Sequence, residues 1–362
     1  MKIVAAETHL IRVPCDTGAP PRAFSGVGWA SIDTLFLRLV TDRGVEGWGE
    51  GFGHACCPAT RAAIETQVAP ALIGADARDI NGLMRQMAER FHLFGRNGPL
   101  VYALSAVDVA LWDIAGKEAG QPLWRLLGGA QRTHLPAYAS LLRYQEPDQV
   151  AAAVARAAAQ GYPAAKLHET GVAQVRAARG AAPALRLMLD VNCPWTVEQA
   201  IAMARALGGC GLDWLEEPVW PPEDHAGLAR VRREGGIRIA AGENAAGLHD
   251  ARHLFEAGAL DIVQPSVAKI GGVSEMRRIA ALAEAFGVRL VPHCAYFGPG
   301  YLASLHLAAA LAPEAPFERL FVELEASPYH DRILAPGGRV AVPDAPGLGC
   351  DPDAAVLRRY AV

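Results

Sequence analysis

The 362-residue sequence lacks the features that mark several classes of protein. Its seven cysteines are odd in number and form no C-x-x-C pair, which argues against a disulfide framework or a zinc ribbon and favours a reducing cytoplasm. No G-x-G-x-x-G or Walker A pattern is present, so neither a nicotinamide dehydrogenase nor a P-loop enzyme is expected. The net charge is −4 and the basic residues are scattered, so we expect no nucleic-acid partner.

Long hydrophobic runs are also scarce. The apolar N-terminal stretch is interrupted by Glu7, which makes it a poor signal peptide. The longest uncharged run lies between Arg289 and Glu314 and contains prolines, glycines and histidines. We interpret it as a strand, a loop and a helix instead of a membrane span, and we expect no membrane partner.

The chain divides into two patterns. Residues 2–14 and 33–50 predict antiparallel strands with a turn at 41–44, and helical periodicity follows at 60–74 and 98–120. From about Leu135, short apolar runs alternate with alanine-rich helical runs, and this alternation predicts parallel strands joined by helices. The eight strand candidates lie within 135–140, 164–168, 185–192, 212–218, 237–243, 260–266, 288–293 and 320–325. Eight such units close into a barrel whose chemistry lies at the carboxyl ends of the strands.

A polar residue recurs at the predicted end of each barrel strand from the second onwards, and successive members lie 23–30 residues apart. They are Lys166 with His168, Asp190 with Asn192, Glu216 with Glu217, Glu243 with Asn244, Ser266, His293 and Glu323. Residues two apart on a strand share a face, so Lys166 and His168 project side by side. Three acids in register would repel one another, and with no histidine or cysteine at ligand spacing they favour Mg²⁺ over zinc.

Several of these stretches resemble the enolase superfamily, in its mandelate racemase/muconate lactonizing enzyme group. They are GVEGWGE, ALSAVDVALWDIAGKEAGQPLWRLLGG, LDVN, LDWLEEPV, AAGEN, KIGG and VPH, in this order. The resemblance covers essentially the whole chain and is nearest to sugar-acid dehydratases and galactarolactone or anhydrogalactonate cycloisomerases. It implies a modified (β/α)7β TIM-like barrel at 129–334 and an α+β capping domain at 1–128, completed by the tail 335–362.

The resemblance also implies the site residues. Asp190, Glu216 and Glu243 match the Mg²⁺ ligands, and only one glutamate of the Glu216–Glu217 pair is expected to enter the barrel. Lys166 matches the first lysine of a Lys-x-Lys pair, and His168 stands in place of the basic second lysine. We expect His168 to remove the α-proton while Lys166, its electrostatic partner, binds the substrate carboxylate.

The far side of the barrel departs from the family pattern. His293 matches the family histidine, but its usual aspartate partner is replaced by Ser266. Glu323 matches the glutamate that hydrogen-bonds developing enolate charge. The broken dyad favours β-elimination, with His293 as the acid, over racemisation. Further substrate contacts are expected from Asn192, Ser266 and the cap residues His54, Trp29 and Arg22, with Phe24 in the same region.

The resulting hypothesis is a cytoplasmic, Mg²⁺-dependent lyase or isomerase that acts on a small carboxylate and removes its α-proton through an enediolate. An acid-sugar dehydratase or a sugar-lactone cycloisomerase is preferred. A racemase or epimerase of a 2-hydroxy acid or an amino-acid derivative is the alternative, and a non-catalytic barrel that binds an acid sugar is an alternative of another class. A homo-oligomer, from dimer to octamer, is expected.

Overall fold

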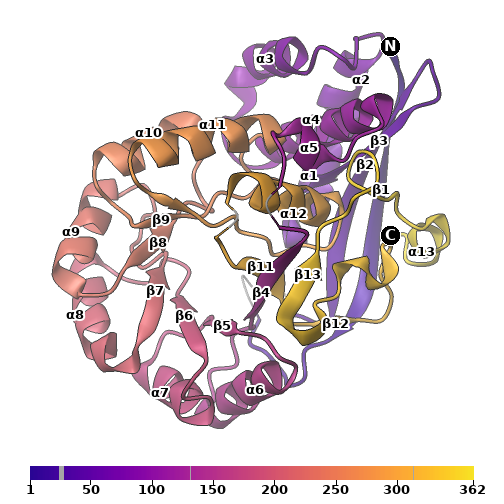
Figure 1. Ribbon diagram of the computed structural model, residues 1–362. Helices are drawn as coiled ribbons and strands as arrows, with labels where there is room; N and C mark the ends of the chain where they lie inside the picture. Colours follow the sequence, from indigo (N-terminus) through magenta and orange to yellow (C-terminus); the bar gives the residue numbers. More distant parts are fainter. Residues whose placement is uncertain (24–27, 131, 313) are drawn as a thin grey trace.

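The computed structural model describes residues 1–23, 28–130, 132–312 and 314–362, so Phe24 lies outside the described residues. Two sheets organise the chain (Figure 1). The first sheet is antiparallel in the order β12-β1-β2-β3. Its strands are β1 (Ile3–Asp16), β2 (Ser31–Thr41), β3 (Glu46–Gly51) and, from far along the chain, β12 (Glu323–Leu324). The predicted strands at 2–14 and 33–50, with their turn, are therefore confirmed.

Helices follow the first three strands of this sheet along the chain. They are the short η1 (His54–Cys56), α1 (Cys57–Ala63), the π-helical η2 (Ile64–Val68), α2 (Ala69–Leu72), α3 (Ile80–Phe91), η3 (His92–Phe94), α4 (Pro99–Ala119) and α5 (Leu123–Leu126). Of these, α1, α2 and α4 pack against the sheet. By length and composition alone α4 could cross a membrane, but 72% of its most apolar 18-residue window is buried inside the protein. Gly47 and Gly49 let β3 approach α4 closely, because a Cβ on Gly49 would lie 1.8 Å from the Ala106 carbonyl oxygen.

The second sheet is a curled parallel sheet, and its order β10-β9-β8-β7-β6-β5-β4-β11 follows the chain until β11 returns beside β4. Its strands are β4 (His134–Ser140), β5 (Ala164–Leu167), β6 (Arg186–Asp190), β7 (Leu212–Glu216), β8 (Ile239–Ala241), β9 (Ile262–Val263), β10 (Arg289–Leu290) and β11 (Phe317–Leu320). The predicted α/β barrel with an antiparallel N-terminal sheet is confirmed; β4 begins one residue before its predicted range, and the next six barrel strands lie within theirs.

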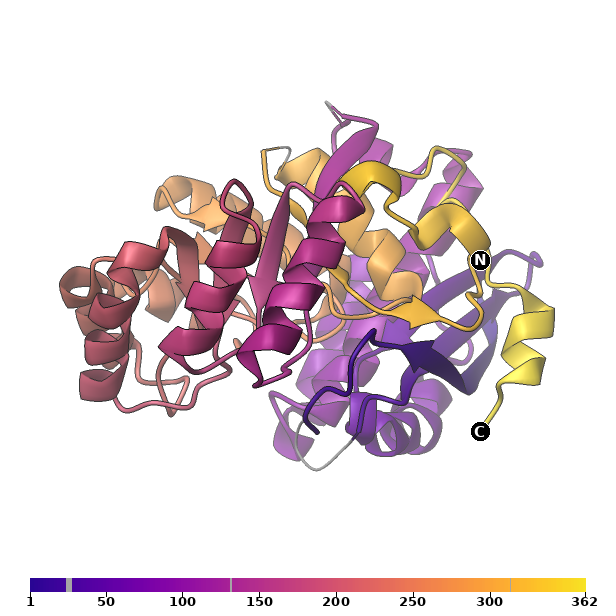
Figure 2. The ribbon, with the colours of Figure 1, turned by 90° about the horizontal axis from the view of Figure 1, so that it is seen from below.

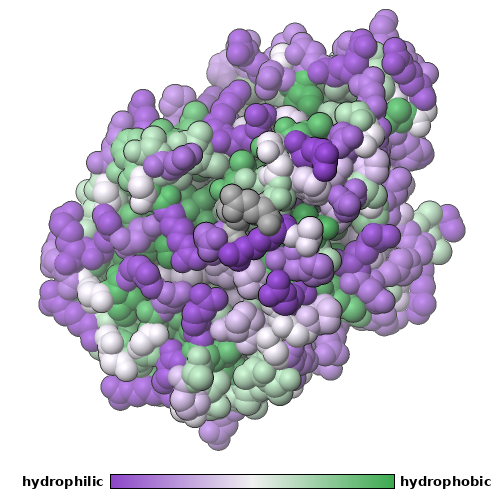
Figure 3. All heavy atoms as spheres, viewed as in Figure 1, coloured by the Kyte–Doolittle hydropathy of each residue, from purple (hydrophilic) through white to green (hydrophobic). Residues whose placement is uncertain are grey.

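Helices alternate with these strands and form the outer ring in Figure 1. They are α6 (Pro147–Ala159), α7 (Val172–Ala181), α8 (Val197–Leu207) with the turn η4 (Gly208–Cys210), α9 (His225–Gly235), α10 (Leu248–Glu256), α11 (Gly272–Ala285) and α12 (Pro299–Leu311). Most carry one apolar face toward the strands; the outer side of α8 and α9 is largely hydrophilic (Figure 3). The run between Arg289 and Glu314 forms β10, a loop and α12, as predicted.

The eighth barrel strand differs from the prediction. We expected it within 320–325, but β11 ends at Leu320 and pairs in parallel with β4, from Phe317↔Ala137 to Leu320↔Ser140. The next residues turn away and form β12, which pairs antiparallel with β1 (Figure 2). The chain then runs through η5 (His330–Ile333), η6 (Pro336–Gly338), β13 (Arg339–Ala341) and α13 (Ala354–Arg359).

His306, in the middle of α12, makes stability depend on pH. Its ring is fully buried, Nδ1 accepts from the Trp124 amide at 3.2 Å, and burial lowers its pKa to about 4. The native state keeps this ring neutral, whereas the unfolded chain binds the proton below roughly pH 6.5. The contribution of neutral His306 to the free energy of unfolding is therefore fully present above roughly pH 6.5. It is lost as the pH falls toward 4, by at most roughly 1.4 kcal/mol per pH unit. Urea unfolding at pH 7.5 and 5.0 should show a smaller pH-dependent loss in His306→Asn than in the wild type. An equal loss in both proteins would contradict this assignment.

Candidate active site

Lys166 lies at the centre of a buried charge cluster at the carboxyl end of β5. Its side chain is fully buried, and Nζ lies 2.7 Å from Glu216 Oε1, 2.8 Å from Glu318 Oε1 and 3.5 Å from Asp190 Oδ2. Burial would lower the pKa of this ammonium, but attraction from Glu216 and Glu318 outweighs it and holds the pKa well above its ordinary value. Lys166 is therefore a fixed cation in this arrangement.

His168 follows Lys166 on the same face but has different neighbours. Its Nδ1 donates to the carbonyl of Leu141, and its Nε2 lies 3.2 Å from Asp190 Oδ2. A carbonyl oxygen only accepts, so Nδ1 carries a proton, and Nε2, beside the Asp190 carboxylate, is the ring nitrogen that can exchange a proton with the site. Lys166 was expected to be the electrostatic partner of His168, but the group nearest to Nε2 is the Asp190 carboxylate.

Both glutamates of the Glu216–Glu217 pair are buried at the mouth, which corrects the expectation that only one would enter. Glu216 accepts from Trp214 Nε1 at 2.9 Å, two residues earlier on the same face. Glu217 has φ of 46°, so the strand alternation ends there, and its Oε1 accepts from the Gly242 amide at 2.9 Å. Burial, followed by repulsion from Glu243, raises the pKa of Glu217 to about 7.

Glu243 and His293 form a pair on the other side of the cluster. His293 Nε2 lies 2.8 Å from Glu243 Oε2, so the proton resides on Nε2, and the buried Nδ1 has no partner among the described residues. Burial would raise the pKa of Glu243, but Lys269 and His293 outweigh it and hold the pKa well below its ordinary value. In place of the missing aspartate, Ser266 donates to the Tyr296 hydroxyl at 3.0 Å, and that hydroxyl donates to the His293 carbonyl at 3.1 Å.

Glu323 was expected at the end of the last barrel strand, and this placement is wrong. Glu323 is exposed on β12, opposite Asp16 of β1. Glu318 of β11 occupies the inward position instead, where it accepts from Ser140 Oγ and from the Cys294 amide, both at 2.8 Å. The interval between successive strand ends could have indicated Glu318. The interval 318 − 293 = 25 falls among the others, whereas 323 − 293 = 30 is the longest.

The proposed substrate-binding residues lie in different surroundings. Asn192 has φ of 56°, and its Oδ1 accepts from Arg143 Nη2 at 3.0 Å. Ser266 is fully buried beneath Tyr296, so its hydroxyl positions that tyrosine. Arg22 is exposed, and its amide donates to the Arg143 carbonyl at 2.7 Å.

The cap residues Trp29 and His54 contact each other, with ring centres 5.6 Å apart. Burial and the nearby His293 and Lys269 lower the pKa of His54 to about 4, which places this cap residue next to the barrel mouth. Lys269, which we did not predict as a site residue, lies with Nζ 5.0 Å from the ring centre of Phe52 and 3.5 Å from Asn244 Oδ1.

Arg143, also missed from the sequence, ties three strand ends together. Its Nε donates to the His168 carbonyl at 2.5 Å, and Nη2 donates to the Val191 carbonyl at 3.1 Å as well as to Asn192. We predict that Arg143→Lys lowers kcat by about 10- to 100-fold with a smaller change in KM, because the outer partners of site residues typically have effects of this size. Arg179→Lys is the matched control, since Arg179 also binds carbonyls, those of Cys210 and Leu185, away from this mouth. Equal kcat losses in the two variants would indicate a general structural role for Arg143.

The donor chemistry of the mouth suits a divalent cation. Five acids face two lysines in a largely buried region, where burial raises the pKa of Glu216 well above its ordinary value and that of Glu217 to about 7, so the five carboxyls are not all charged near pH 7. The acids are Asp190, Glu216, Glu217, Glu243 and Glu318, and the lysines are Lys166 and Lys269. All the acidic donors are hard oxygens, which suit Mg²⁺. Among the described residues no three ligands converge on one point, because the protein's own lysine and histidines pair with the carboxylates.

A barrel with an acid cluster and two histidines at the strand ends presents general acid and base groups to a bound substrate. Residues 149–356 match the family described as Enolase C-terminal domain-like, and residues 9–128 match the Mandelate racemase / muconate lactonizing enzyme N-terminal domain. The chain therefore belongs to the enolase superfamily, in its mandelate racemase/muconate lactonizing enzyme group, and is an enzyme of that group.

Similar proteins extend over nearly the full chain. D-galactarolactone cycloisomerase of Agrobacterium fabrum is 34% identical, over 97% of this chain and 96% of its own. 3,6-Anhydro-alpha-L-galactonate cycloisomerase of Streptomyces coelicolor is 33% identical, over 99% of each chain. The crystal structure of a racemase from Streptomyces coelicolor A3(2) with bound magnesium is 32% identical, covers 99% of this chain and 100% of its own, and superposes with a TM-score of 0.85.

Proposed function

We propose that the protein is a Mg²⁺-dependent acid-sugar dehydratase or sugar-lactone cycloisomerase that removes a proton α to a carboxylate and expels a β-oxygen. The observation that carries the proposal is the pair of hydrogen-bonded states of two histidines that flank the acid cluster from the end of β5 and from the residues after β10. His168 is anchored through Nδ1, which donates to Leu141, so Nε2 is the nitrogen that exchanges a proton with a substrate. His293 presents a protonated Nε2, because this atom lies 2.8 Å from the Glu243 carboxylate.

These two states assign the proton transfers. His168 Nε2 accepts the α-proton, and Asp190, 3.2 Å away, stabilises the imidazolium that forms. Lys166 places a permanent positive charge where the substrate carboxylate gains electron density. His293 then donates its Nε2 proton to the leaving β-oxygen, and Glu243 orients its ring for that transfer.

Asp190, Glu216 and Glu243 would hold the Mg²⁺, as the gathering of hard carboxylate oxygens at the strand ends supports. When bound, the ion supplies Lewis-acid neutralisation of charge on the substrate carboxylate. Glu318, held by Lys166 and Ser140, lies beside the same cluster in the inward position expected of Glu323. Burial would raise its pKa, but Lys166 and His293 outweigh burial and lower it to about 2, so this carboxylate is ionised and cannot donate a hydrogen bond to enolate charge.

The substrate is proposed to be a sugar acid or its lactone, because relatives at 33–34% identity over nearly the full chain carry cycloisomerase names of this kind. Two relatives named as dehydratases, of arabinonate and of D-galactonate, are 31% and 33% identical. The test is a screen of mono- and diacid sugars, their lactones and amino-acid derivatives with Mg²⁺ in D₂O. Loss of water or opening of a lactone ring, detected by mass change and NMR, supports the proposal.

Histidines on two sides of one substrate also suit epimerisation, the second candidate. That reaction would return an acid of unchanged composition with deuterium at an inverted α-carbon. Thermal stabilisation by an acid without any turnover or exchange across the screen would instead identify a binding protein and overturn the enzymatic proposal.

A further inference from the structure

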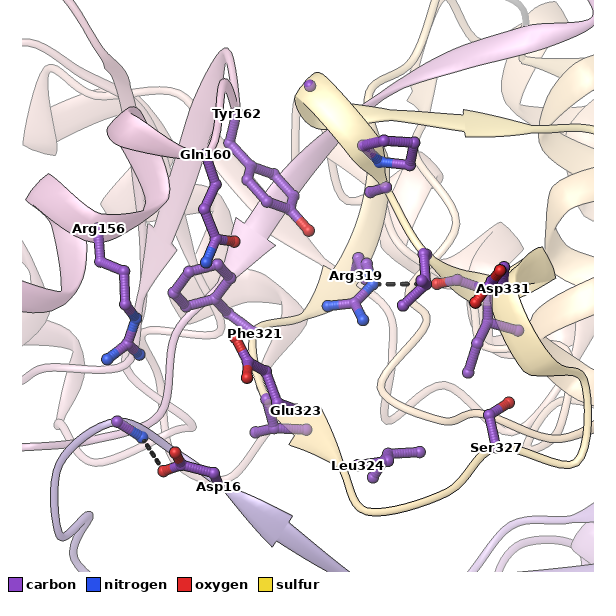
Figure 4. A pocket seen from close by; sticks show the side chains of 17 residues that line it. Asp16, Arg156, Gln160, Tyr162, Arg319, Phe321, Glu323, Leu324, Ser327 and Asp331 are labelled. Carbon is purple, nitrogen blue, oxygen red and sulfur yellow. Dashed lines mark hydrogen bonds between the residues drawn. The ribbon is translucent and has the colours of Figure 1, made fainter. Parts of the chain in front are cut away.

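A cavity of about 780 Å³ lies on the outer side of the barrel, apart from the mouth (Figure 4). It opens between α6, β11 and the segment that follows β12. In the described part of the chain, β11 is followed by β12 and η5 instead of an outer helix, so beside α6 the segment after β12, and not a helix, forms the other wall of the cavity. None of the described acid-cluster residues lines the cavity.

Arg319 brings a buried positive charge to this cavity. It follows Glu318 on β11 and therefore points to the opposite side of the sheet, away from the barrel interior. Its residue is 7% exposed, Nε donates to the Ile333 carbonyl at 3.0 Å, and Nη1 donates to the Leu320 carbonyl at 3.2 Å. Among the described residues no carboxylate lies within ion-pair distance of this guanidinium, so its partners are neutral oxygens. A buried guanidinium whose partners are all neutral is stabilised when it binds an anion.

Arg156 of α6 provides a second guanidinium that points into the cavity from the facing wall (Figure 4). Its Nη2 donates to the Thr17 carbonyl at 3.1 Å, and its centre lies 4.9 Å from the ring centre of Phe321. Gly18 makes room for it, since a Cβ there would lie 1.5 Å from Arg156 Nη1. Within the described ranges, Arg156 also has no carboxylate at ion-pair distance.

The remaining lining restricts the kind of anion. Between the two arginines the wall is largely apolar and is formed by Phe321, Val322, Leu324, Ile333 and Leu334. Three exposed acids, Asp16, Glu323 and Asp331, lie at the rim. Water screens these rim carboxylates, but they still disfavour a ligand with more than one negative charge.

We propose that this cavity is a second binding site, which takes a small organic monocarboxylate with an apolar body. The carboxylate binds the guanidinium of Arg319, Arg156 attracts it from the facing wall, and the apolar body packs on the wall that carries Phe321 and Leu324. The inference does not depend on the proposed reaction, because it uses none of the residues assigned to the mouth.

The test is calorimetric titration of the full-length, Mg²⁺-loaded protein with phenylacetate, its neutral analogue phenylacetamide and the dianion phenyl phosphate. Phenylacetate should bind saturably at one site that persists when Mg²⁺ is removed by chelation, because the mouth is proposed to bind carboxylates through the metal. Phenylacetamide should bind at least about tenfold more weakly, since a charge-assisted hydrogen bond contributes about this factor, and phenyl phosphate should bind more weakly because the lining carboxylates repel its second charge. Binding that disappears with Mg²⁺ would place the ligand at the mouth and overturn the proposal, as would tighter binding of phenyl phosphate.

Variants of the arginines and of the acids that line the cavity should change ligand affinity in opposite directions. Arg156→Met and Arg319→Gln should each weaken phenylacetate binding by about tenfold or more, because each loses a charged donor. Glu323→Gln should strengthen phenyl phosphate binding, whereas Glu325→Gln, whose carboxylate contacts Arg359 and Tyr360, should not. Arg156 is only partly buried, so its replacement should not unfold the protein. Arg156→Met therefore still tests the proposal if Arg319→Gln does not fold. Wild-type affinity in Arg156→Met would overturn the proposal.

Discussion

Replacing His168 by alanine should abolish exchange of the substrate α-proton with solvent and lower kcat by about 10²- to 10⁴-fold, the usual contribution of a general base. The reason is the anchored ring: Leu141 holds the Nδ1 proton, so Nε2 is the nitrogen that exchanges a proton with a substrate. The measurement is deuterium incorporation by NMR, with the acid found in the substrate screen. Wild-type exchange in His168→Ala would show that the imidazole only packs or selects substrate, and the base would then be sought at His293.

His293→Asn is the companion variant for this test. If His293 donates the proton to the leaving oxygen, the variant should lose turnover but keep α-proton exchange, because abstraction by His168 precedes that step. Loss of both activities in His293→Asn would instead indicate that His293 removes the proton. The two variants therefore separate the base from the acid.

Replacing Glu216 by glutamine should weaken Mg²⁺ binding by at least about 100-fold and abolish activity, because it removes the charge of a hard oxygen ligand. Chelation of the wild type should abolish activity in the same way, and added Mg²⁺ should restore it. Calorimetry with Mg²⁺ alone gives a readout that does not depend on turnover. Mg²⁺ should also raise the thermal stability of the wild type, since a ligand that binds only the native state stabilises it, and should do so less in Glu216→Gln.

Glu217→Gln is the matched control. The glutamine carbonyl can still accept from the Gly242 amide, so local structure is kept while one charge is lost. We expect Mg²⁺ affinity within about tenfold of the wild type, since removal of an outer partner has effects of this order. If Glu217→Gln loses the metal and Glu216→Gln retains it, the ligand assignment must pass to Glu217, which is also buried and lies beside Glu243.

The strand ends from Lys166 to His293 could be placed from the sequence because each follows a short apolar strand at a regular interval. Their approach to one another then follows from parallel pairing, which brings carboxyl ends to one side of the sheet. Glu318 was missed because two of the four residues at 317–320, Glu318 and Arg319, are charged, whereas 320–325 begins with three apolar residues, so local pattern favours the wrong segment. Strand pairing decides which segment enters the barrel. The segment 317–320 pairs with β4 in parallel, whereas residues 323–324 pair with β1 in antiparallel orientation.

The sequence by itself determined the barrel, its antiparallel partner sheet and the residue types at most strand ends, since these depend on periodicity and spacing. Only the tertiary structure decided which atoms meet. Asp190, not Lys166, lies closest to Nε2 of His168. A positive φ brings Glu217 into the mouth, and Arg143 reaches carbonyls and an amide on two other strand ends. Such contacts join residues far apart in the chain through side-chain rotamers and single backbone torsions, and local sequence pattern does not encode either.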